Sequence, residues 1–410
     1  MKTQSYDVIV IGAGLAGLMA ALAAREQGAE VAVLAEGGGA FELSSGCIDL
    51  FGATESPWTA MTGLRKHPYT LLGAAAVREA VSAFVAASGR MGLPYSEPAD
   101  GRNQVTVTAV GNLRTTYLPA PGAAVIRPDP AADPGRRPVA VIGLQGMKEF
   151  HPGVVAEGLK RALPGTPVTA RWVPLPAGTP DDLQPVQLAR LLEEPVFRAK
   201  LLQALPSVPA GTTVLMPAVL GLDGAEAVRA DVSAALGAPV GEVPLLSPSL
   251  PGLRLATRLY RYVQRRGVEL CMGVQAAGAA AEGGRITTVT GQTVGGPVTY
   301  RAGAVIVATG GLLGRGLEVR DRTLCETVFD LPVEQPGGPW ADADLLSVRG
   351  HAFVRAGVRT DDWLRPEGRA NLYICGKLLA GYDPYAEGCG GGVAIASGWR
   401  AGGLAGGAVR

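Results

Sequence analysis

The spacing Gly12-x-Gly14-x-x-Gly17 is the first pattern in the chain whose residues could do chemistry. It follows a β-branched apolar run at 7–11 and precedes 15–25, which has the composition and length of a helix. In such a turn Gly12 permits the tight bend, Gly14 lets phosphates approach the backbone, and Gly17 lets helix and strand pack closely. The free N–H groups and partial positive charge of the helix N-terminus then bind the phosphates. The arrangement predicts a phosphate-bearing cofactor.

A second glycine group lies far along the chain. The buried-type apolar strand 304–308 ends in Thr309, Gly310 and Gly311. Small residues at this place let the strand end lie close to a cofactor. A buried strand that ends in Ala-Thr-Gly is an independent mark of flavoproteins with two dinucleotide-binding domains.

A third mark combines a strand that ends at Gly376 with the run Gly390, Gly391 and Gly392. A glycine turn into a closing helix would aim backbone N–H groups at the flavin pyrimidine, where any Cβ would collide with the ring. The helix dipole would stabilise the negative charge that develops at N1–C2=O when a flavin is reduced. Three marks in the right order from N- to C-terminus predict a flavin-binding fold.

The end of the second strand, 31–34, departs from the usual dinucleotide pattern. An acidic residue normally ends this strand and holds the adenosine ribose. The alternation of Val31 and Val33 places Ala35 at that position, and Glu36 lies one residue further. Either the strand end shifts so that Glu36 reaches the ribose, or the contact is missing. The second option suits a mononucleotide, so the residues leave both FAD and FMN open.

The connection after this strand contains a glycine triplet at 37–39, then Ser44, Ser45 and Gly46. Small hydroxylated residues here suit the cofactor pyrophosphate and the isoalloxazine edge, although Gly/Ser clusters are also typical of surface loops. His67 follows this connection. A histidine can exchange protons near neutral pH, so His67 is a candidate for contact with substrate or flavin, while single histidines are more often structural.

Composition narrows the class of protein. The 410 residues include 37 Lys and Arg against 36 Asp and Glu, so no strong field draws the chain to nucleic acid or anionic lipid. The five cysteines show no CxxC or ferredoxin-like spacing, so we expect neither an iron–sulfur cluster nor another metal site. Scattered thiols without a signal peptide fit a reducing cytoplasm. The uncharged run 8–24 contains the glycine turn and starts like a strand, and no other stretch is long enough for a membrane span.

Alternating strand and helix patterns predict an α/β protein of the two-dinucleotide-binding-domain (Rossmann-like) flavoprotein kind with an inserted second α/β domain. We expect a discontinuous flavin-binding domain, 1–135 and 251–410, and an inserted cap or substrate domain at 136–250. The Pro-, Ala- and Gly-rich stretch 119–138 is typical of a linker. We expect helices at 72–87, 153–162, 186–204 and 225–236, and strands at 105–108, 113–118, 139–143, 168–173, 213–217, 243–246, 269–273, 286–290 and 298–301.

A further helix, which opens at Pro251, carries four arginines on one face because they are spaced by three or four residues. They are Arg254, Arg258, Arg261 and Arg265. Such a face is usually solvated, and the alternative is docking of a phosphate or of an acidic partner.

Seven segments of the chain resemble those of one family, the B subunit of anaerobic glycerol-3-phosphate dehydrogenase, and the resemblance covers essentially the whole length. The most distinctive segment is GYDPYAEGCGGGVA at 381–394. The others are VIGAGLAGL near the start, SSGCIDL at 44–50, HPYTLLG at 67–73, NLRTTYL at 112–118, MPAVLGL at 216–222 and SPSLPGLRL at 247–255. The order of motifs is also similar to that of the succinate dehydrogenase and fumarate reductase flavoproteins.

The resemblance implies an FMN-containing subunit that works beside a larger, FAD-containing A subunit, with an iron–sulfur C subunit anchoring both to the membrane. It implies a quinone-linked dehydrogenase that oxidises sn-glycerol 3-phosphate to dihydroxyacetone phosphate in anaerobic fumarate or nitrate respiration. The chain would then be cytoplasmic and held at the inner face of the cell membrane by its partners. FMN is the expected cofactor and FAD the alternative, in line with the missing carboxylate at Ala35.

The expected chemistry is a two-electron flavin reaction in which a base takes the hydroxyl proton while hydride passes to flavin N5. His67 is the leading candidate for the base, with His351 behind it. A phosphate substrate needs Arg or Lys, and Arg254 and Arg365 are the candidates, although either could form a structural salt bridge instead. The competing hypotheses are an electron-relay subunit with no substrate site of its own, a fumarate-reductase-like enzyme, and a non-redox scaffold without flavin.

Overall fold

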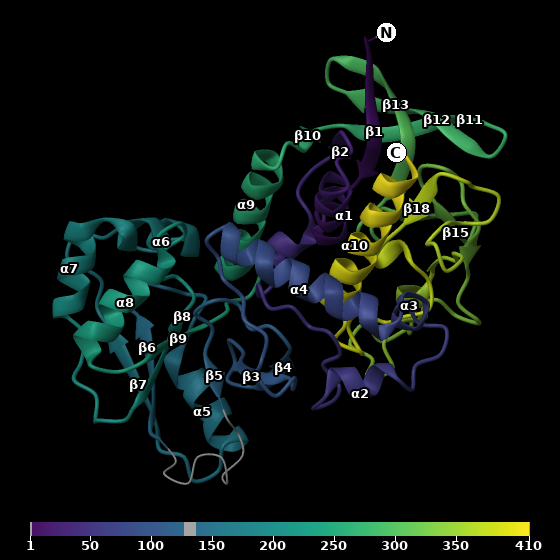
Figure 1. Cartoon of the computed structure of the whole chain (residues 1–410). Coiled ribbons are helices and arrows are strands. Elements are labelled where there is room, and N and C mark those ends of the chain that lie inside the picture. The colour runs from purple at the N-terminus through teal and green to yellow at the C-terminus, as the bar shows by residue number, and fades with distance from the viewer. Residues whose placement is uncertain (1, 127–136, 410) are drawn as a thin grey trace. The chain divides into compact units, whose positions relative to one another are not determined.

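The computed structural model describes residues 2–126 and 137–409, which form two compact units. Unit 1 comprises Met1–Phe41, Asp49–Pro94 and Thr257–Arg410, and unit 2 comprises Glu42–Ile48 and Tyr95–Ala256 (Figure 1). The helix expected to open at Pro251 therefore begins in one unit and ends in the other. Part of the expected linker at 119–138 lies outside the described residues.

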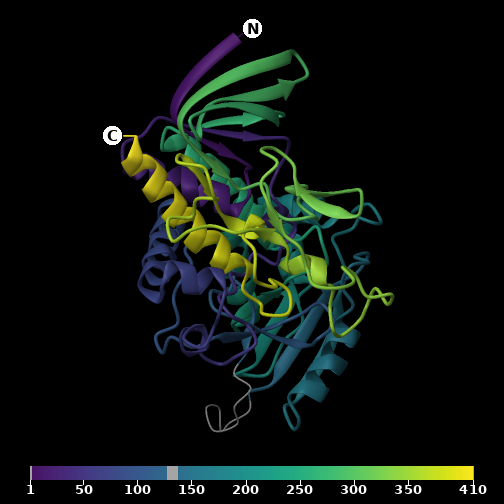
Figure 2. The ribbon, with the colours of Figure 1, turned by 90° about the vertical axis from the view of Figure 1, so that its right-hand side faces the viewer.

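A seven-stranded sheet forms the centre of unit 1, in the order β10-β2-β1-β13-β12-β11, with β18 also paired to β13. The pairs among β10, β2, β1, β13 and β18 are parallel, whereas β11 and β12 form an antiparallel hairpin on the other part of β13. Figure 2 shows β1 and the green strands of this hairpin running to the same end of the unit. The strands are β1 (Lys2–Ile11), β2 (Val31–Ala35), β10 (Glu269–Met272), β11 (Gln275–Glu282), β12 (Arg285–Thr293), β13 (Gly296–Val307) and β18 (Leu372–Ile374).

Helices α1 (Leu15–Glu26) and α10 (Gly390–Ala408) lie side by side against this sheet, one near each end of the chain (Figure 1). Glycines of α10 allow the close approach, because a Cβ on Gly398 would lie 2.2 Å from the carbonyl oxygen of Ala16 and one on Gly402 would lie 2.0 Å from that of Ala20. The partners advance in the same direction along both helices, so α1 and α10 are parallel.

The remaining elements of unit 1 are short apart from α4 and the second half of α9. The helices are α2 (Pro57–Met61), α3 (Pro68–Leu72), α4 (Ala74–Arg90) and α9 (Leu250–Arg265). The 3₁₀ turns are η2 (Ala352–Arg355) and η3 (Gly376–Leu378), and η1 (Ala40–Leu43) begins in unit 1 and ends in unit 2. The two-stranded sheets pair β14 (Leu317–Arg320) with β15 (Thr323–Glu326) and β16 (Val333–Glu334) with β17 (Gly357–Val358).

Unit 2 is built on a four-stranded parallel sheet in the order β7-β6-β8-β9, whose buried apolar strands form the core with the helices beside them. Its strands are β6 (Val139–Leu144), β7 (Val168–Val173), β8 (Thr213–Pro217) and β9 (Val240–Val243), and its helices α5 (Pro152–Ala162), α6 (Pro185–Glu193), α7 (Pro195–Gln203) and α8 (Ala225–Leu236). A three-stranded antiparallel sheet of β3 (Gln104–Val107), β4 (Leu113–Thr116) and β5 (Val125–Ile126) completes it.

The three-stranded sheet belongs to unit 2 because its backbone is bonded there. The N–H of Ala124 donates to the carbonyl of Glu242 at 2.9 Å, and the N–H of Glu242 donates to Gly122 at 2.8 Å. The chain passes between the compact units after residues 41, 48, 94 and 256, whereas the sequence placed the divisions after 135 and 250.

Most expected elements are present, and the exceptions have local causes. The helix expected at 186–204 is two helices, because Glu194 precedes a proline and takes an extended ψ of 120°. The strand expected at 243–246 lies earlier, at Val240–Val243, and β11 was not anticipated. The two short strands expected at 298–301 and 304–308 are one continuous strand, β13. Among the described residues, no helix is long and apolar enough to cross a bilayer.

Candidate functional site

The first and second glycine marks meet at the ends of β1 and β13. Gly12 has a φ of +111°, and a Cβ at this position would lie 2.4 Å from the carbonyl oxygen of Ala308 and 3.2 Å from the amide nitrogen of Thr309. Its N–H donates to the carbonyl of Leu34 in the neighbouring strand at 2.8 Å. Only glycine fits this crossing, as the pattern predicted.

The other two glycines of the turn differ in what surrounds them. A Cβ on Gly17 would lie 1.9 Å from the carbonyl oxygen of Gly12, so this glycine is needed for packing. A Cβ on Gly14 would meet no heavy atom within 4 Å, so the side of the turn that would face a phosphate is open. Helix α1 has no side-chain cap and no acidic residue in its first turn, which leaves its N-terminus suited to an anion.

The glycine triplet after β2 lies against this turn. A Cβ on Gly39 would lie 2.5 Å from the Cα of Gly14. The hydroxyl of Tyr260 accepts the N–H of Gly39 at 2.9 Å and donates to the carbonyl of Ala13 at 3.1 Å. This side chain therefore holds the loop and the fingerprint turn together.

The hydroxyl group of Thr309 indicates whether the residues at the strand ends fit a bound nucleotide. Its Oγ1 is buried and has no hydrogen-bond partner among the described residues. A Cβ on Gly316 would lie 2.5 Å from this oxygen, so the chain leaves glycine beside it. A buried hydroxyl without a partner is costly unless a ligand or water satisfies it. The residues at this place therefore fit a phosphate-bearing cofactor.

The third mark joins the same site through Gly376, which has a φ of +67°. A Cβ on Gly376 would lie 2.8 Å from the Cβ of Ala16 in α1, and its N–H donates to Oγ of Ser397 in α10 at 2.9 Å. Because Gly398 is level with Ala16, the first turn of α10 extends about 10 Å beyond that of α1, at 1.5 Å per residue. The N-termini of two parallel helices thus face one side, roughly 10 Å apart along their axes.

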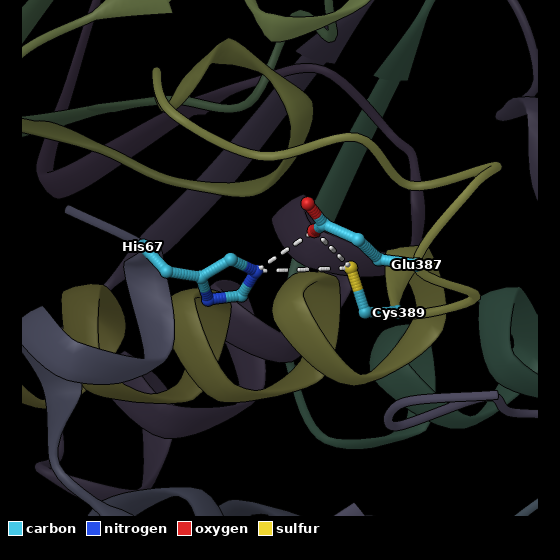
Figure 3. Close-up of side chains that lie close together, drawn as sticks. All are labelled: His67, Glu387 and Cys389. Atoms are coloured by element: carbon cyan, nitrogen blue, oxygen red, sulfur yellow. Dashed lines mark hydrogen bonds and ion pairs between the residues drawn. The ribbon is translucent and has the colours of Figure 1, made fainter. Parts of the chain in front are cut away.

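A polar cluster lies at the N-terminus of α10, formed by His67, Glu387 and Cys389 (Figure 3). Nε2 of His67 lies 3.2 Å from Oε2 of Glu387 and 3.9 Å from Sγ of Cys389, and Sγ lies 3.6 Å from Oε2. Nδ1 of His67 accepts the N–H of Tyr69 at 3.0 Å, so it caps the start of α3. An acceptor Nδ1 places the proton of a neutral ring on Nε2, which then donates to Glu387.

This tautomer has two consequences for the buried His67 side chain. The three ligand-type atoms lie within 4.8 Å of one another, but a metal ion would need the lone pair that the Nε2 proton occupies. A base would need it as well, so direct proton acceptance by His67 requires one of its two hydrogen bonds to break.

Glu387 is the centre of the cluster. Burial raises the pKa of its carboxyl, but the hydrogen bonds from His67 and from the N–H of Asp383, with nearby Arg355, outweigh burial and hold the pKa below its ordinary value. Nη1 of Arg355 donates to Oε1 at 3.0 Å. Burial, followed by the charge of Glu387, raises the pKa of the Cys389 thiol, so this sulfur stays protonated.

Lys377 connects the cluster to the second glycine mark. A Cβ on Gly311 would lie 3.0 Å from its Cγ, and its Nζ lies 4.7 Å from the ring centre of Tyr382 and 3.4 Å from the carbonyl oxygen of Ala356. Burial lowers the pKa of Lys377 to about 8, against the opposing effect of Asp383. The sequence reasoning missed this lysine, although it directly follows Gly376.

Arg254 lies in unit 2, where it is buried with Glu242. Nη1 and Nη2 donate to the two carboxylate oxygens at 2.5 and 2.9 Å, and Nε donates to the carbonyl of Gly221 at 2.9 Å. Oε1 of Glu242 also accepts the N–H of Leu220 at 3.0 Å. Arg254 is 3 % exposed, so its guanidinium ties the ends of β8 and β9 to α9 and has no free edge for a phosphate.

The serine connection also belongs to unit 2. Oγ of Ser44 accepts the N–H of Gly46 at 3.1 Å, and Oγ of Ser45 accepts the N–H of Cys47 at 3.4 Å. A Cβ on Gly46 would lie 2.8 Å from the backbone of Pro251. A role of Ser44, Ser45 and Gly46 toward the cofactor stays a prediction.

Three other predicted residues have partners outside the polar cluster. Arg365 pairs with Asp361 through contacts of 3.0 and 3.1 Å, at the rim of a surface pocket of about 580 Å³. Glu36 pairs with Arg315 at 3.0 Å. His351 accepts the N–H of Asp342 through Nδ1 at 3.1 Å, and its Nε2 lies 3.0 Å from the carbonyl of Leu345, so it holds a loop.

Comparison with known proteins assigns the class first. The family model described as an FAD binding domain matches residues 7–393. The chain is therefore a flavin-binding oxidoreductase, and the expected fold class is confirmed. The B subunit of anaerobic glycerol-3-phosphate dehydrogenase from Vibrio cholerae is 31% identical over 97% of this chain and 95% of its own length. The Yersinia enterocolitica protein of that name is 32% identical over 96% of both chains. This chain belongs to the family of anaerobic glycerol-3-phosphate dehydrogenase B subunits.

Among solved structures, Mycobacterium smegmatis Sdh1 aligns with 100% of this chain and 70% of its own, at 15% identity and a TM-score of 0.43. E. coli quinol fumarate reductase FrdA aligns with 100% of this chain and 71% of its own, at 11% identity and a TM-score of 0.45.

Proposed function

We propose that this chain is the flavin-carrying B subunit of a respiratory complex that oxidises sn-glycerol 3-phosphate to dihydroxyacetone phosphate and passes the electrons to quinone. Support for the substrate comes from the names of relatives that match almost their whole length. The observation that carries the flavin part is the meeting of Gly12, Thr309 and Gly376 at the carboxyl ends of the neighbouring parallel strands β1, β13 and β18. Nucleotides bind at such strand ends in α/β proteins.

The proposal places the chain on the cytoplasmic side of the cell membrane, in anaerobic respiration with fumarate or nitrate as terminal acceptor. A catalytic A subunit and an iron–sulfur C subunit hold it there. The names of the relatives, which designate one subunit of several, support an assembly.

A flavin bound at these strand ends would supply reversible two-electron transfer. The first turn of α1 and the open side of Gly14 would hold its phosphate, and Thr309 Oγ1 would find there the partner that it lacks in the chain. Gly310 and Gly311 would lie beside the flavin. Gly390, Gly391 and Gly392, the first residues of α10, would present the N-terminus of this helix to the flavin ring. Within the chain, a Cβ on Gly392 would lie 2.1 Å from the hydroxyl oxygen of Tyr69, so this glycine also serves packing.

The flavin is either FAD, which the name of the matching family model supports, or FMN. The argument for FMN comes from the sequence, because Ala35 carries no ribose-binding group, and the neighbouring Glu36 forms an exposed ion pair with Arg315. Denaturing the purified protein and weighing the released cofactor distinguishes the two, since FAD contains an additional adenylate.

One observation favours an electron-relay subunit whose substrate site belongs to the A subunit. Arg254 and Arg365, the candidates for the substrate phosphate, are both paired with carboxylates, and His67 has no free lone pair. For this chain to oxidise substrate itself, a phosphate would have to displace Asp361 or Glu242, and His67 would have to give up Tyr69 or Glu387.

Reconstitution separates the two functions. The flavin-loaded chain is mixed with glycerol 3-phosphate and an artificial electron acceptor, first alone and then with the A subunit. Dye reduction by this chain alone supports a substrate site of its own, and reduction that requires the A subunit supports the relay. A colourless protein that binds neither FAD nor FMN would contradict both and favour a scaffold.

A further inference from the structure

Lys377 spans the distance between two parts of the proposed flavin site. Its backbone follows Gly376 at the end of β18, and its Cγ lies against Gly311 of the second glycine mark. Its ammonium group reaches the Tyr382 ring, which belongs to the same segment as the N-terminus of α10. The side chain therefore extends from the ends of the strands, at Gly311, toward the segment that contains Tyr382 and leads to the polar cluster.

The surroundings leave this cation without a directly paired carboxylate, although the charges of Asp383 and Glu387 partly offset the effect of its burial. Within the described residues Lys377 forms no ion pair, and its hydrogen bond to the Ala356 carbonyl is long, at 3.4 Å. The acids nearby are already engaged: Glu387 accepts from His67 and Arg355, and Oδ1 of Asp383 accepts the N–H groups of Tyr385 and Ala386 at 3.0 Å. A half-buried ammonium in such a place is costly unless a ligand brings negative charge to it.

The electrostatic environment agrees with this geometry. Burial lowers the pKa of Lys377 to about 8, so the group is still mostly charged at neutral pH but responds strongly to any added negative charge. The partial positive charge of the α10 N-terminus acts in the same region and also favours a bound negative charge.

We propose that Lys377 is the cation that stabilises the negative charge of the reduced flavin at N1–C2=O and thereby raises the flavin's midpoint potential. The inference rests on the proposed flavin site. Its chemistry is recognition of an anion by a side-chain ammonium, and the anion could come from the reduced pyrimidine or from the flavin phosphate. The electrostatic interaction of the ammonium with Cys389, the N-cap residue of α10, favours the pyrimidine. The phosphate is expected at the N-terminus of α1, which is offset from that of α10 by about 10 Å along the helix axes.

The test measures the potential of the bound flavin, and no turnover is needed. The full chain, loaded with the flavin found in it, is titrated spectroelectrochemically at pH 7 as wild type, Lys377→Met and Lys377→Arg. Lys148→Met is the matched control, since Lys148 is an exposed lysine of unit 2 paired with Asp182. We expect Lys377→Met to lower the equilibrium constant for two-electron reduction at least tenfold, which is about 30 mV. Lys377→Arg should stay within threefold of wild type, and Lys148→Met should not change it.

A second readout uses sulfite, whose addition to N5 of oxidised flavin leaves negative charge on N1–C2=O and bleaches the visible absorbance. Lys377→Met should weaken sulfite binding at least tenfold. An unchanged potential and sulfite affinity in Lys377→Met, with flavin bound, would overturn the inference. So would loss of oxidised flavin from Lys377→Met in a protein whose circular dichroism is unchanged, because that result assigns the ammonium to the phosphate. Wild-type protein that takes up no flavin would overturn the proposed function as well, so the two failures are distinguishable.

Discussion

Nε2 of His67 lies 3.2 Å from Oε2 of Glu387, although 320 residues separate them in the sequence. The same ring caps helix α3 through Nδ1, so one buried side chain links the start of α3 to the segment that leads into α10. The histidine thus has a structural task, whatever part it takes in proton transfer.

Replacing His67 by alanine should lower the free energy of unfolding by about 2–4 kcal/mol, because it removes a helix cap and leaves Glu387 without a buried partner. Urea unfolding followed by circular dichroism measures the change. His151→Ala is the matched control, since His151 is exposed and its side chain makes no capping bond, and it should cost less than about 1 kcal/mol. Equal losses in both variants would contradict the role assigned to His67.

Lys377 makes stability depend on pH in alkaline solution. Its folded-state pKa of about 8 lies below the ordinary lysine value of 10.5, so between these values the unfolded chain binds more protons than the folded chain. Stability should therefore rise with pH across this window, by up to about 3 kcal/mol, and the penalty should be fully present below pH 8. The difference in unfolding free energy between flavin-free wild type and Lys377→Met should shrink or reverse from pH 7.5 to pH 10. A constant difference would show that the ammonium is solvated.

Arg254 and Glu242 should behave as a buried pair in which each residue needs the other. Arg254→Gln should cost about 3–5 kcal/mol because it leaves a buried carboxylate without its partner, and the double variant with Glu242→Gln should recover part of that loss. Arg365→Gln, which removes a surface pair, should change stability by less than about 1 kcal/mol. Additive losses in the double variant would show that the two side chains do not interact.

Two adjacent glycines of α10 offer a strict comparison. Gly402→Ala would place a Cβ 2.0 Å from the Ala20 carbonyl and should destabilise the protein by about 2 kcal/mol or more, because the two helices must separate. Gly403→Ala meets nothing within 4 Å and should be neutral or stabilise by up to about 1 kcal/mol through helix propensity. Thermal melts measure both. Similar effects in the two variants would contradict the close helix packing.

Gly14 should separate cofactor binding from folding. Its φ of −75° and ψ of 175° suit alanine, and a Cβ there meets no atom of the chain. Gly14→Ala should therefore unfold like wild type but bind flavin at least tenfold more weakly, as measured by fluorescence titration, because the methyl group blocks the phosphate. Gly12→Ala should lose stability instead, because its Cβ would overlap the Ala308 carbonyl. Undiminished flavin affinity in Gly14→Ala would contradict the binding of the cofactor phosphate at this turn.

The glycine marks could be predicted because a glycine spacing indicates a tight turn or a close crossing even when the distant partner is unknown. The break before Pro195 has a local cause and should have been anticipated. The partners of His67, Lys377 and Arg254 could not be, since each is fixed by the packing of elements far apart in sequence. For the same reason a spacing that placed four arginines on one helix face could not show that Arg254 points into unit 2.

The parallel contact between α1 and α10 also constrains how the protein is made. On a ribosome that adds about 5–20 residues per second, α10 emerges roughly 20 to 70 s after α1. Until then the apolar face of the first βαβ unit lacks its lasting cover, whereas every strand of the unit 2 sheet has already been synthesised. Unit 2 should therefore acquire its structure first, and the nascent nucleotide-binding half should depend on chaperones for that interval.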